Sequence, residues 1–487
     1  MAKAYILPRC KPEEQGVSSK NILSFIEDVE RSGLELHGFM LLRGGHVVSE
    51  GFWQPFGPDY RRTIFSLSKS FTSTAIGFAA SEGLVSLEDR VISFFPEDLP
   101  DKPEANLSAM TIRHLLSMAA GHAEDTARGL LMSGDGNWVR AFLAQPVEHE
   151  PGTFFVYNSG ASYMLSAILR KASGQNLLEY LTPRLFEPLG IEGADWEKCP
   201  RGTDAGGWGL SVRLEDIAKF GQLYLQKGNW LGKQLLPDGW AEEASSFKVK
   251  NGEDPESDWS QGYAYQFWRC RHNAYRGDGA FGQYCVVMPE QDAVFAAVSG
   301  LGDMQPILDL CWEHLLLPMQ EAPLADNPGE NAKLCGRLAW LAYPPLKLES
   351  RPELESRISG KSYRLENNEL GISGMRFIFD GTGGRLLMKM SGIESELRLG
   401  SGEWLLSDLG HKLMVSYIES LGTKVAASAA WQDDSTLRLK LRYVESPFCI
   451  SFMCVFEEGR LRLQARLNVS FGPVVFPDIM GYEVNAG

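Results

Sequence analysis

Two residues whose types and spacing can support chemistry are Ser66 and Lys69, within Phe65-Ser66-Leu67-Ser68-Lys69. In a helix, side chains at positions i and i+3 lie on one face, so an amine would lie next to a hydroxyl. The first turn of a helix also presents unpaired backbone N–H groups, whose partial positive charge stabilises an oxyanion or a developing alkoxide. The spacing therefore predicts a nucleophilic serine suited to acyl transfer.

A third group is required, because a lysine with its ordinary pKa of about 10.4 is a cation at neutral pH and cannot accept the serine proton. Either burial and hydrogen bonds favour the neutral amine, or a second residue acts as the base. Tyr157 follows the turn dipeptide Pro151-Gly152, and the adjacent Asn158 and Ser159 are candidate hydrogen-bonding partners. The alternative for Tyr157 is a purely structural role as a core tyrosine.

The same S-x-x-K spacing occurs again between Ser245 and Lys248. This copy runs into the polar segment 249–254, so we expect a solvated helix end there. Ser66 instead opens a stretch in which apolar residues recur at helical spacing: Leu67, Phe71, Ala75, Phe78 and Ala79. Such a stripe predicts a buried helix that holds Ser66 and Lys69 rigidly.

The elements around this pair include both strands and helices. Two alternating apolar runs between residues 37 and 53, separated by Gly44-Gly45, predict a β-hairpin. The region 84–195 has mostly helical periodicity, interrupted by prolines and glycines. Further strands are predicted at 262–268, 283–288 and 293–298, followed by a helix at 304–317. A sheet built from both ends of this region would accommodate all of these strands.

A polar segment with several prolines divides the chain. It begins near residue 321 and includes Pro344-Pro345. Beyond it, the strict alternation of 436–443 and the turn dipeptide Asp433-Asp434 predict antiparallel strands. We expect the following units: a domain at 1–320 with a helical subdomain at about 84–195, a linker at 321–349, and a β-rich domain at 350–487.

The composition is that of a folded, acidic protein. Of 487 residues, 44% are hydrophobic and 22% are charged, which suffices for large cores. The net charge of −15 repels phosphate backbones and anionic membranes, and neither a membrane span nor a secretion signal is visible, so we expect no nucleic-acid or membrane partner and a cytoplasmic location. The eight cysteines show no C-x-x-C pattern, which is typical of reduced thiols. The histidines are scattered, so we expect neither a metal nor another cofactor.

Three motifs together resemble the penicillin-recognising serine hydrolases, the family of serine β-lactamases and penicillin-binding proteins. Ser66-x-x-Lys69 matches the nucleophile motif, Tyr157-Asn158-Ser159 resembles the Tyr-x-Asn element, and Gly277-Asp278-Gly279 lies where the family has Lys-Thr-Gly or His-x-Gly. Connecting segments between residues 10 and 320 also agree, and the branch is that of class C β-lactamases, esterase B and 6-aminohexanoate-dimer hydrolase. The implied fold is α/β of the α+β kind: an antiparallel sheet flanked by helices, with a helical subdomain, joined here to a C-terminal antiparallel β domain.

The resemblance also implies roles for six positions. The catalytic residues would be Ser66, Lys69 and Tyr157, and the oxyanion or substrate-binding residues would be Ser159, Gly279 and Ala280. Serine attack on a carbonyl would form an acyl-enzyme that water then hydrolyses. The oxyanion would lie between the backbone N–H groups of Ser66 and Ala280.

Two departures from the family pattern bear on the substrate. Ser159 replaces an expected Asn, so a shorter hydroxyl must orient Lys69 or the substrate. Gly277 replaces the Lys or His that helps relatives bind a substrate carboxylate, and the neighbouring Arg276 would point to the opposite face of its strand. We therefore expect a hydrolase of small esters or amides. The alternatives are β-lactamase or D-Ala-D-Ala peptidase-like activity, and a catalytically silent binding protein on the same scaffold; the oligomeric state is not predicted.

Overall fold

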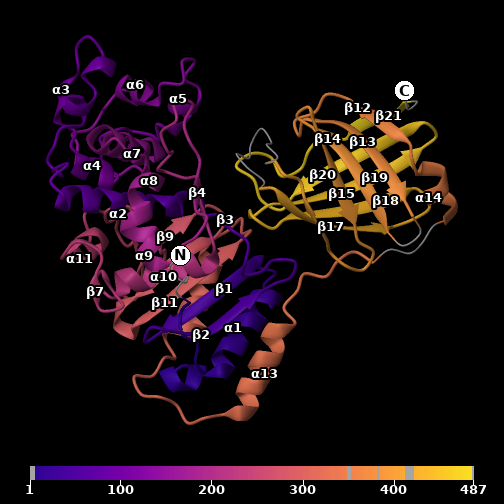
Figure 1. Cartoon of the computed structure of the whole chain (residues 1–487), viewed down its shortest axis with the longest axis horizontal. Coiled ribbons are helices and arrows are strands. Elements are labelled where there is room, and N and C mark those ends of the chain that lie inside the picture. The colour runs from indigo at the N-terminus through magenta and orange to yellow at the C-terminus, as the bar shows by residue number, and fades with distance from the viewer. Residues whose placement is uncertain (1–5, 348–351, 381–382, 412–421, 485–487) are drawn as a thin grey trace.

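The computed structural model describes residues 6–347, 352–380, 383–411 and 422–484. Figure 1 shows two lobes: a larger one formed by the first two thirds of the chain and a smaller one formed by the C-terminal strands. Within the described ranges, every helix is too short or too polar to span a lipid bilayer.

The larger lobe is built on a six-stranded antiparallel sheet with the order β2-β1-β11-β10-β9-β8. The strands are β1 (Leu36–Arg43), β2 (His46–Phe52), β8 (Trp268–Arg269), β9 (Tyr275–Gly279), β10 (Gln283–Met288) and β11 (Ala293–Ser299). β1 pairs with β11, with Leu41 opposite Phe295. The predicted N-terminal hairpin and a sheet assembled from both ends of the region are therefore confirmed.

The strand predicted at 262–268 is wrong except for its last residue. This segment forms turns, with Gln266 in the left-handed region at φ 62°, and only Trp268 enters β8. Its aromatic residues are buried, but Tyr263 packs in a different cluster from Tyr265 and Phe267. The continuous burial of residues 262–268 thus imitated the apolar run of a buried strand.

The sheet is covered on both faces, which explains why its central strands are continuously apolar. Along β1, Phe39 and Leu41 face one layer while Met40 and Leu42 face the other. The first layer contains α1 (Ser19–Arg31), α12 (Gln305–Leu310), the π-helical η7 (Cys311–Leu316) and α13 (Pro328–Ala339). The second contains α2 (Ser68–Ser81) and α10 (Leu214–Leu225).

Further helices extend this second layer into the helical region at the top of Figure 1. They are α3 (Ala105–Ala109), α4 (Ile112–Leu116), α5 (Ala127–Leu131), α6 (Trp138–Leu143), α7 (Ser159–Ser173) and α8 (Leu177–Leu181). α9 (Glu187–Leu189) lies lower, beside α10. α11 (Trp240–Ser245) lies lower on the same side. A small sheet of order β3-β5-β4, with β3 (Arg62–Thr63), β4 (Asp195–Trp196) and β5 (Leu210–Val212), connects this region to the nucleophile segment.

The smaller lobe is a ten-stranded antiparallel sheet of order β15-β14-β13-β12-β21-β20-β19-β18-β17-β16. Its strands are β12 (Ser362–Leu365), β13 (Ile372–Phe379), β14 (Gly384–Met390), β15 (Ile393–Leu399), β16 (Leu405–Asp408), β17 (Lys424–Trp431), β18 (Thr436–Tyr443), β19 (Cys449–Glu457), β20 (Arg460–Leu467) and β21 (Ile479–Val484). The sheet curls so that its edge strands β15 and β16 contact each other. The predicted C-terminal antiparallel β domain is confirmed, including the strand at 436–443.

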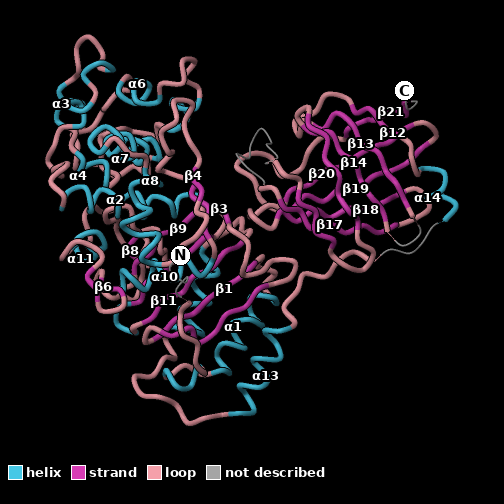
Figure 2. Tube along the Cα trace, in the orientation of Figure 1, coloured by secondary structure: helices cyan, strands magenta, loops and turns pink. Residues whose placement is uncertain are grey.

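The two lobes contact each other beside β3, and Figure 2 shows that the contact is made by loops at one end of the β domain. Arg442 forms an ion pair with Glu35 at 2.6 Å. Arg62 donates to the carbonyl of Val444 at 3.0 Å, and the N–H of Thr63 donates to the carbonyl of Glu445. Arg62 and Thr63 directly precede the segment that carries Ser66, so the β domain is anchored next to that segment.

Candidate active site

Ser66 lies at the junction between a short strand and a buried helix. β3 leads into η2 (Phe65–Leu67), a single 3-10 turn, and α2 begins only at Ser68. Ser66 thus precedes the α-helix that we expected it to open. It is partly exposed, although the residues on both sides of it are buried.

α2 is buried around its whole circumference from Ser68 to Ala79, beyond the predicted apolar stripe. Several of its serine and threonine side chains can be buried because they form hydrogen bonds with neighbouring backbone groups. Ser70 donates to the carbonyl of Gln266 at 2.8 Å, and Thr72 donates to the carbonyl of Gly206 at 2.8 Å. Neighbouring loops therefore fix the rotation and position of the helix that carries Lys69.

Lys69 is 1% exposed, and its amine contacts three uncharged oxygens. Its Nζ is 3.1 Å from Oγ of Ser66, 3.1 Å from Oγ of Ser159 and 2.6 Å from the carbonyl oxygen of Gly207. These contacts aim the amine at the serine hydroxyl. The predicted proximity of the two side chains is thus present.

Tyr157 completes the group from the segment before α7. The Nζ of Lys69 lies 4.9 Å from the centre of its ring, which stacks on Trp268 with centroids 5.1 Å apart. Burial raises the pKa of the Tyr157 phenol well above its usual value; the Asp278 carboxyl acts in the same direction, and a hydrogen bond with Ser66 opposes it. At neutral pH the group is therefore a neutral phenol that can donate a proton.

The two residues after Tyr157 have different roles. Asn158 is 1% exposed and caps α7: its Oδ1 accepts from Thr126 and from the N–H of Ala161. Asn158 was a candidate hydrogen-bonding partner in the site, and the structure shows that the start of α7 engages its Oδ1. Ser159, the first residue of α7, does reach Lys69.

The third motif lies on β9, directly beneath the nucleophile segment. A side chain at Gly277 would overlap Leu67 and Ser70, and a side chain at Gly279 would overlap the carbonyl oxygen of Ile64. Both glycines are therefore required by the close approach of β9 to η2 and α2. The position of Gly277 has no room for the Lys or His of relatives unless the helix moves.

Arg276 and Asp278 alternate with these glycines and point to the other face of β9, as the period of a strand requires. Both are buried, and Nε of Arg276 lies 2.8 Å from Oδ2 of Asp278. The guanidinium also lies over the ring of Trp259 at 4.4 Å. Burial raises the pKa of the Asp278 carboxyl, while the charge of Arg276 lowers it. Arg276 is thus held in an ion pair and cannot replace the missing cation.

Two backbone N–H groups, of Ser66 and Ala280, have no hydrogen-bond acceptor among the described residues. They come from segments in contact, because Gly279 approaches the backbone of Ile64 and Leu67. Ser66 and Ala280 are both partly exposed. Paired, unoccupied N–H groups beside a serine hydroxyl can stabilise an oxyanion.

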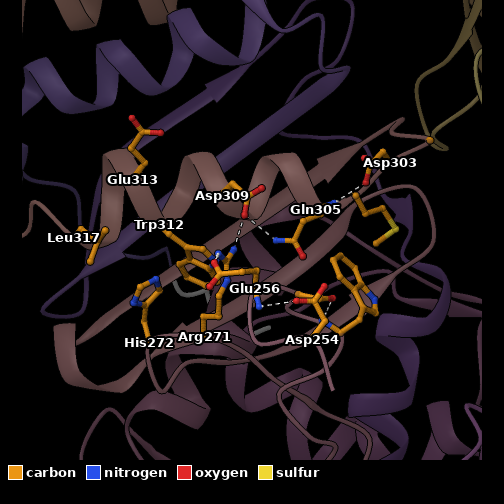
Figure 3. Close-up of a pocket in the computed structure, with 14 residues that line it drawn as sticks. Asp254, Glu256, Arg271, His272, Asp303, Gln305, Asp309, Trp312, Glu313 and Leu317 are labelled. Carbon is orange, nitrogen blue, oxygen red and sulfur yellow. Dashed lines mark hydrogen bonds and ion pairs between the residues drawn. The ribbon is translucent and has the colours of Figure 1, made fainter. Parts of the chain in front are cut away.

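A separate hollow of about 880 Å³ lies under α12 and η7 and contains none of the predicted site residues. Figure 3 shows carboxyl groups around it, with Arg271 bound to Asp309. Arg271 also binds Asp258 at 2.8 Å. Among the described residues, no three His, Cys, Asp or Glu side chains gather as ligands for a metal ion.

Sequence reasoning missed two features of the site. The contact of Gly207 with Lys69 is made by a backbone carbonyl, so no residue type in the sequence indicates it. The Gly-Trp-Gly run at 207–209 indicates only an unusual turn. The ion pair of Arg276 and Asp278 could have been found from their i, i+2 spacing on a predicted strand.

Comparisons with known proteins agree with this geometry. The sequence profile of the family described as Beta-lactamase matches residues 26–307. The 6-aminohexanoate-dimer hydrolase of Paenarthrobacter ureafaciens is 24% identical over 285 residues, which cover 54% of this chain and 72% of that protein.

Solved structures share the fold. The octameric penicillin-binding protein homologue from Pyrococcus abyssi superposes with a TM-score of 0.50 at 15% identity, covering 95% of this chain and 99% of that one. EstCE1, a hydrolase with promiscuous acyltransferase activity, gives a TM-score of 0.50 at 16% identity over 60% of this chain and 99% of its own. The family profile spans more than half of the sequence and includes the segments that place Ser66, Lys69 and Tyr157 side by side, so the chain belongs to the beta-lactamase family.

Proposed function

We propose that the protein is a serine hydrolase that cleaves small esters or amides through an acyl-enzyme on Ser66. The observation that carries this proposal is the amine of Lys69, 3.1 Å from the hydroxyl of Ser66 and buried. The relationship to a 6-aminohexanoate-dimer hydrolase and the fold shared with EstCE1 support hydrolase chemistry in general.

In the first step, Oγ of Ser66 attacks the carbonyl carbon and its proton passes to the neutral amine of Lys69. The carbonyl oxygen becomes an oxyanion that accepts hydrogen bonds from the N–H groups of Ser66 and Ala280. The contacts of Lys69 with Ser159 and Gly207 keep its nitrogen aimed at the serine throughout.

Collapse of the tetrahedral intermediate breaks the bond to the leaving oxygen or nitrogen, which takes a proton from the Tyr157 hydroxyl. The proton held by Lys69 then restores the phenol. The raised pKa of Tyr157 favours this role as a proton donor over a role as a phenolate base. Water repeats the attack on the acyl-enzyme, and the acid is released as Ser66 regains its proton.

The third motif favours substrates without a carboxylate. Relatives bind a substrate carboxylate with a Lys or His cation, whereas this chain has Gly277 under α2 and the acidic Asp278 next to it. Arg276 and Asp278 neutralise each other on the opposite face of β9, so neither supplies a cation for a substrate carboxylate. This argues against β-lactamase or D-Ala-D-Ala peptidase-like activity.

The test is labelling with a fluorophosphonate followed by intact mass and peptide mapping. We expect one adduct, on Ser66, which is lost in Ser66→Ala and retained in the matched control Ser245→Ala. A folded protein that gives no adduct and turns over no ester or amide would instead be a binding protein on this scaffold. Cleavage of a β-lactam at a rate equal to that of neutral esters would overturn the argument from the third motif.

A further inference from the structure

The residues directly next to the two N–H donors are both phenylalanines in strained backbone conformations. Phe65 precedes Ser66 and has φ 47°, while Phe281 follows Ala280 and has φ 66°. Side chains with a Cβ rarely adopt this left-handed region, so surrounding contacts must hold both residues there. Their rings meet edge to face, with centroids 5.7 Å apart.

The β domain supplies those contacts. Phe448, from the turn between β18 and β19, is fully buried against Phe65 and Phe281, at 6.3 and 5.6 Å. Phe471, from the loop between β20 and β21, lies 5.8 Å from Phe65 and 4.8 Å from Phe281. We call these four rings the aromatic cluster; it joins the C-terminal domain to the nucleophile segment.

Within the aromatic cluster, only Phe471 is largely exposed, at 62%. Its loop carries further exposed apolar residues, with Val474 at 36% and Val475 at 63%. The base of the loop is fixed, because Asn468 accepts from the N–H of Cys449 at 2.7 Å and donates to the carbonyl of Pro447 at 2.9 Å. Covering a fixed apolar surface with an apolar group lowers the free energy in water.

We propose that Phe471 and its loop form an apolar wall for the acyl group of the substrate, supplied to the Ser66 site by the C-terminal domain. This inference rests on the proposed function. It predicts esters or amides of apolar carboxylic acids as the substrate class, since a longer acyl chain would cover more of this surface.

The acyl group is assigned to this wall because the leaving group must lie near the proton donor. Tyr157 stacks on Trp268, which pairs with Arg276 near the start of β9. Ala280 follows the opposite end of β9 from Arg276. The acyl group, on the other side of the carbonyl carbon, then extends toward Phe281 and Phe471.

The test compares kcat and KM of wild type and Phe471→Ala on 4-nitrophenyl acetate and 4-nitrophenyl octanoate, which differ only in the acyl chain. We expect kcat/KM for the octanoate to fall about tenfold, mainly through KM, and that for the acetate to change less than about twofold. Phe471→Leu should recover most of the loss. Trp340→Ala removes an aromatic residue that is 83% exposed at the end of α13, in the layer on the sheet face opposite α2, and should leave kcat/KM for both esters unchanged.

Three outcomes would overturn the inference while leaving the proposed function intact: equal losses with both esters, no loss with either, or a loss confined to octyl acetate, in which the long chain is on the leaving group. If the wild-type protein hydrolyses none of these esters and Ser66 is not labelled, the proposed function itself fails.

Discussion

The two S-x-x-K segments have the same spacing but different surroundings. Lys69 is 1% exposed and its Nζ contacts uncharged oxygens of Ser66, Ser159 and Gly207. Lys248 lies beyond the end of α11, where it pairs with the carboxylate of Glu243 at 2.8 Å.

A carboxylate partner stabilises the ammonium ion and keeps its proton in place, whereas neutral oxygens do so less strongly. Spacing brings a hydroxyl and an amine within reach of each other in both segments, and we expect the partners of the amine to decide whether it can accept a proton. The following predictions test this contrast, from the largest expected effect to the smallest.

Lys69→Met keeps the length and burial of the side chain but removes the amine. We expect kcat for an activated ester to fall by about 10²–10⁴, the usual contribution of a general base. Steady-state kinetics, with circular dichroism to confirm folding, would measure it. If Lys69→Met and Lys248→Met lowered kcat equally, the contrast between the two segments would be wrong.

Gly279→Ala tests the close approach of β9 to the segment that carries Ser66 and Lys69, which the segment of Ser245 and Lys248 does not share. The added methyl group would overlap the carbonyl of Ile64 and push the Ala280 N–H away from that of Ser66. We expect kcat to fall by about 10²–10³, as when one oxyanion donor is lost. Gly302→Ala, where a side chain meets open space, is the control and should retain wild-type kcat.

Tyr157→Phe retains the ring on Trp268 and removes the hydroxyl. We expect kcat to fall about 10²-fold with little change in Tm. Because burial raises the pKa of Tyr157 above its ordinary value, the phenol stays protonated through the alkaline range. Any alkaline limb in the pH profile of kcat should therefore persist in the variant; its disappearance would show that the tyrosine titrates there.

Lys248→Ala should have the smallest effect, with unchanged kcat and a loss of about 0.5 kcal/mol in the free energy of unfolding at pH 7. The hydrogen bond from Lys248 lowers the pKa of Glu243. A carboxyl with a lowered pKa in the folded state stabilises the fold above its unfolded pKa of about 4.3, and this contribution is lost as the pH falls through the folded value. Urea denaturation at pH 7 and pH 3 should therefore show a difference between variant and wild type only at pH 7.

The local parts of the site could be predicted from the sequence, and the long-range parts could not. The proximity of Ser66 and Lys69 follows from helical spacing, and the assignment of Gly279 to the site follows from the resemblance to the family. By contrast, Phe471 lies 405 positions after Ser66 in the chain, and no periodicity connects the two. For Asn158 the sequence left the role open, because its type suits both a hydrogen bond within the site and a helix cap, and only the fold decides which.

The same limit applies to the fold. Continuous apolar runs predicted β10 and β11, because buried strands covered on both faces have this pattern. The segment 262–268 has a similar pattern, yet Gln266 takes a left-handed conformation that ends any strand. Its aromatic residues are buried through contacts with Tyr157, Phe220 and Trp240, which lie elsewhere in the sequence, so the local pattern was not informative.

The enclosure of α2 has a practical consequence for anyone who wishes to alter this protein in the laboratory. From Ser68 to Ala79 every position is buried, including serines and threonines whose hydroxyl groups are bonded to distant loops. A library randomised along this helix would therefore yield few folded members. Diversity is better introduced at Val474 and Val475, whose exposed side chains lie outside the aromatic cluster, so selectivity could evolve while the nucleophile segment is left unchanged.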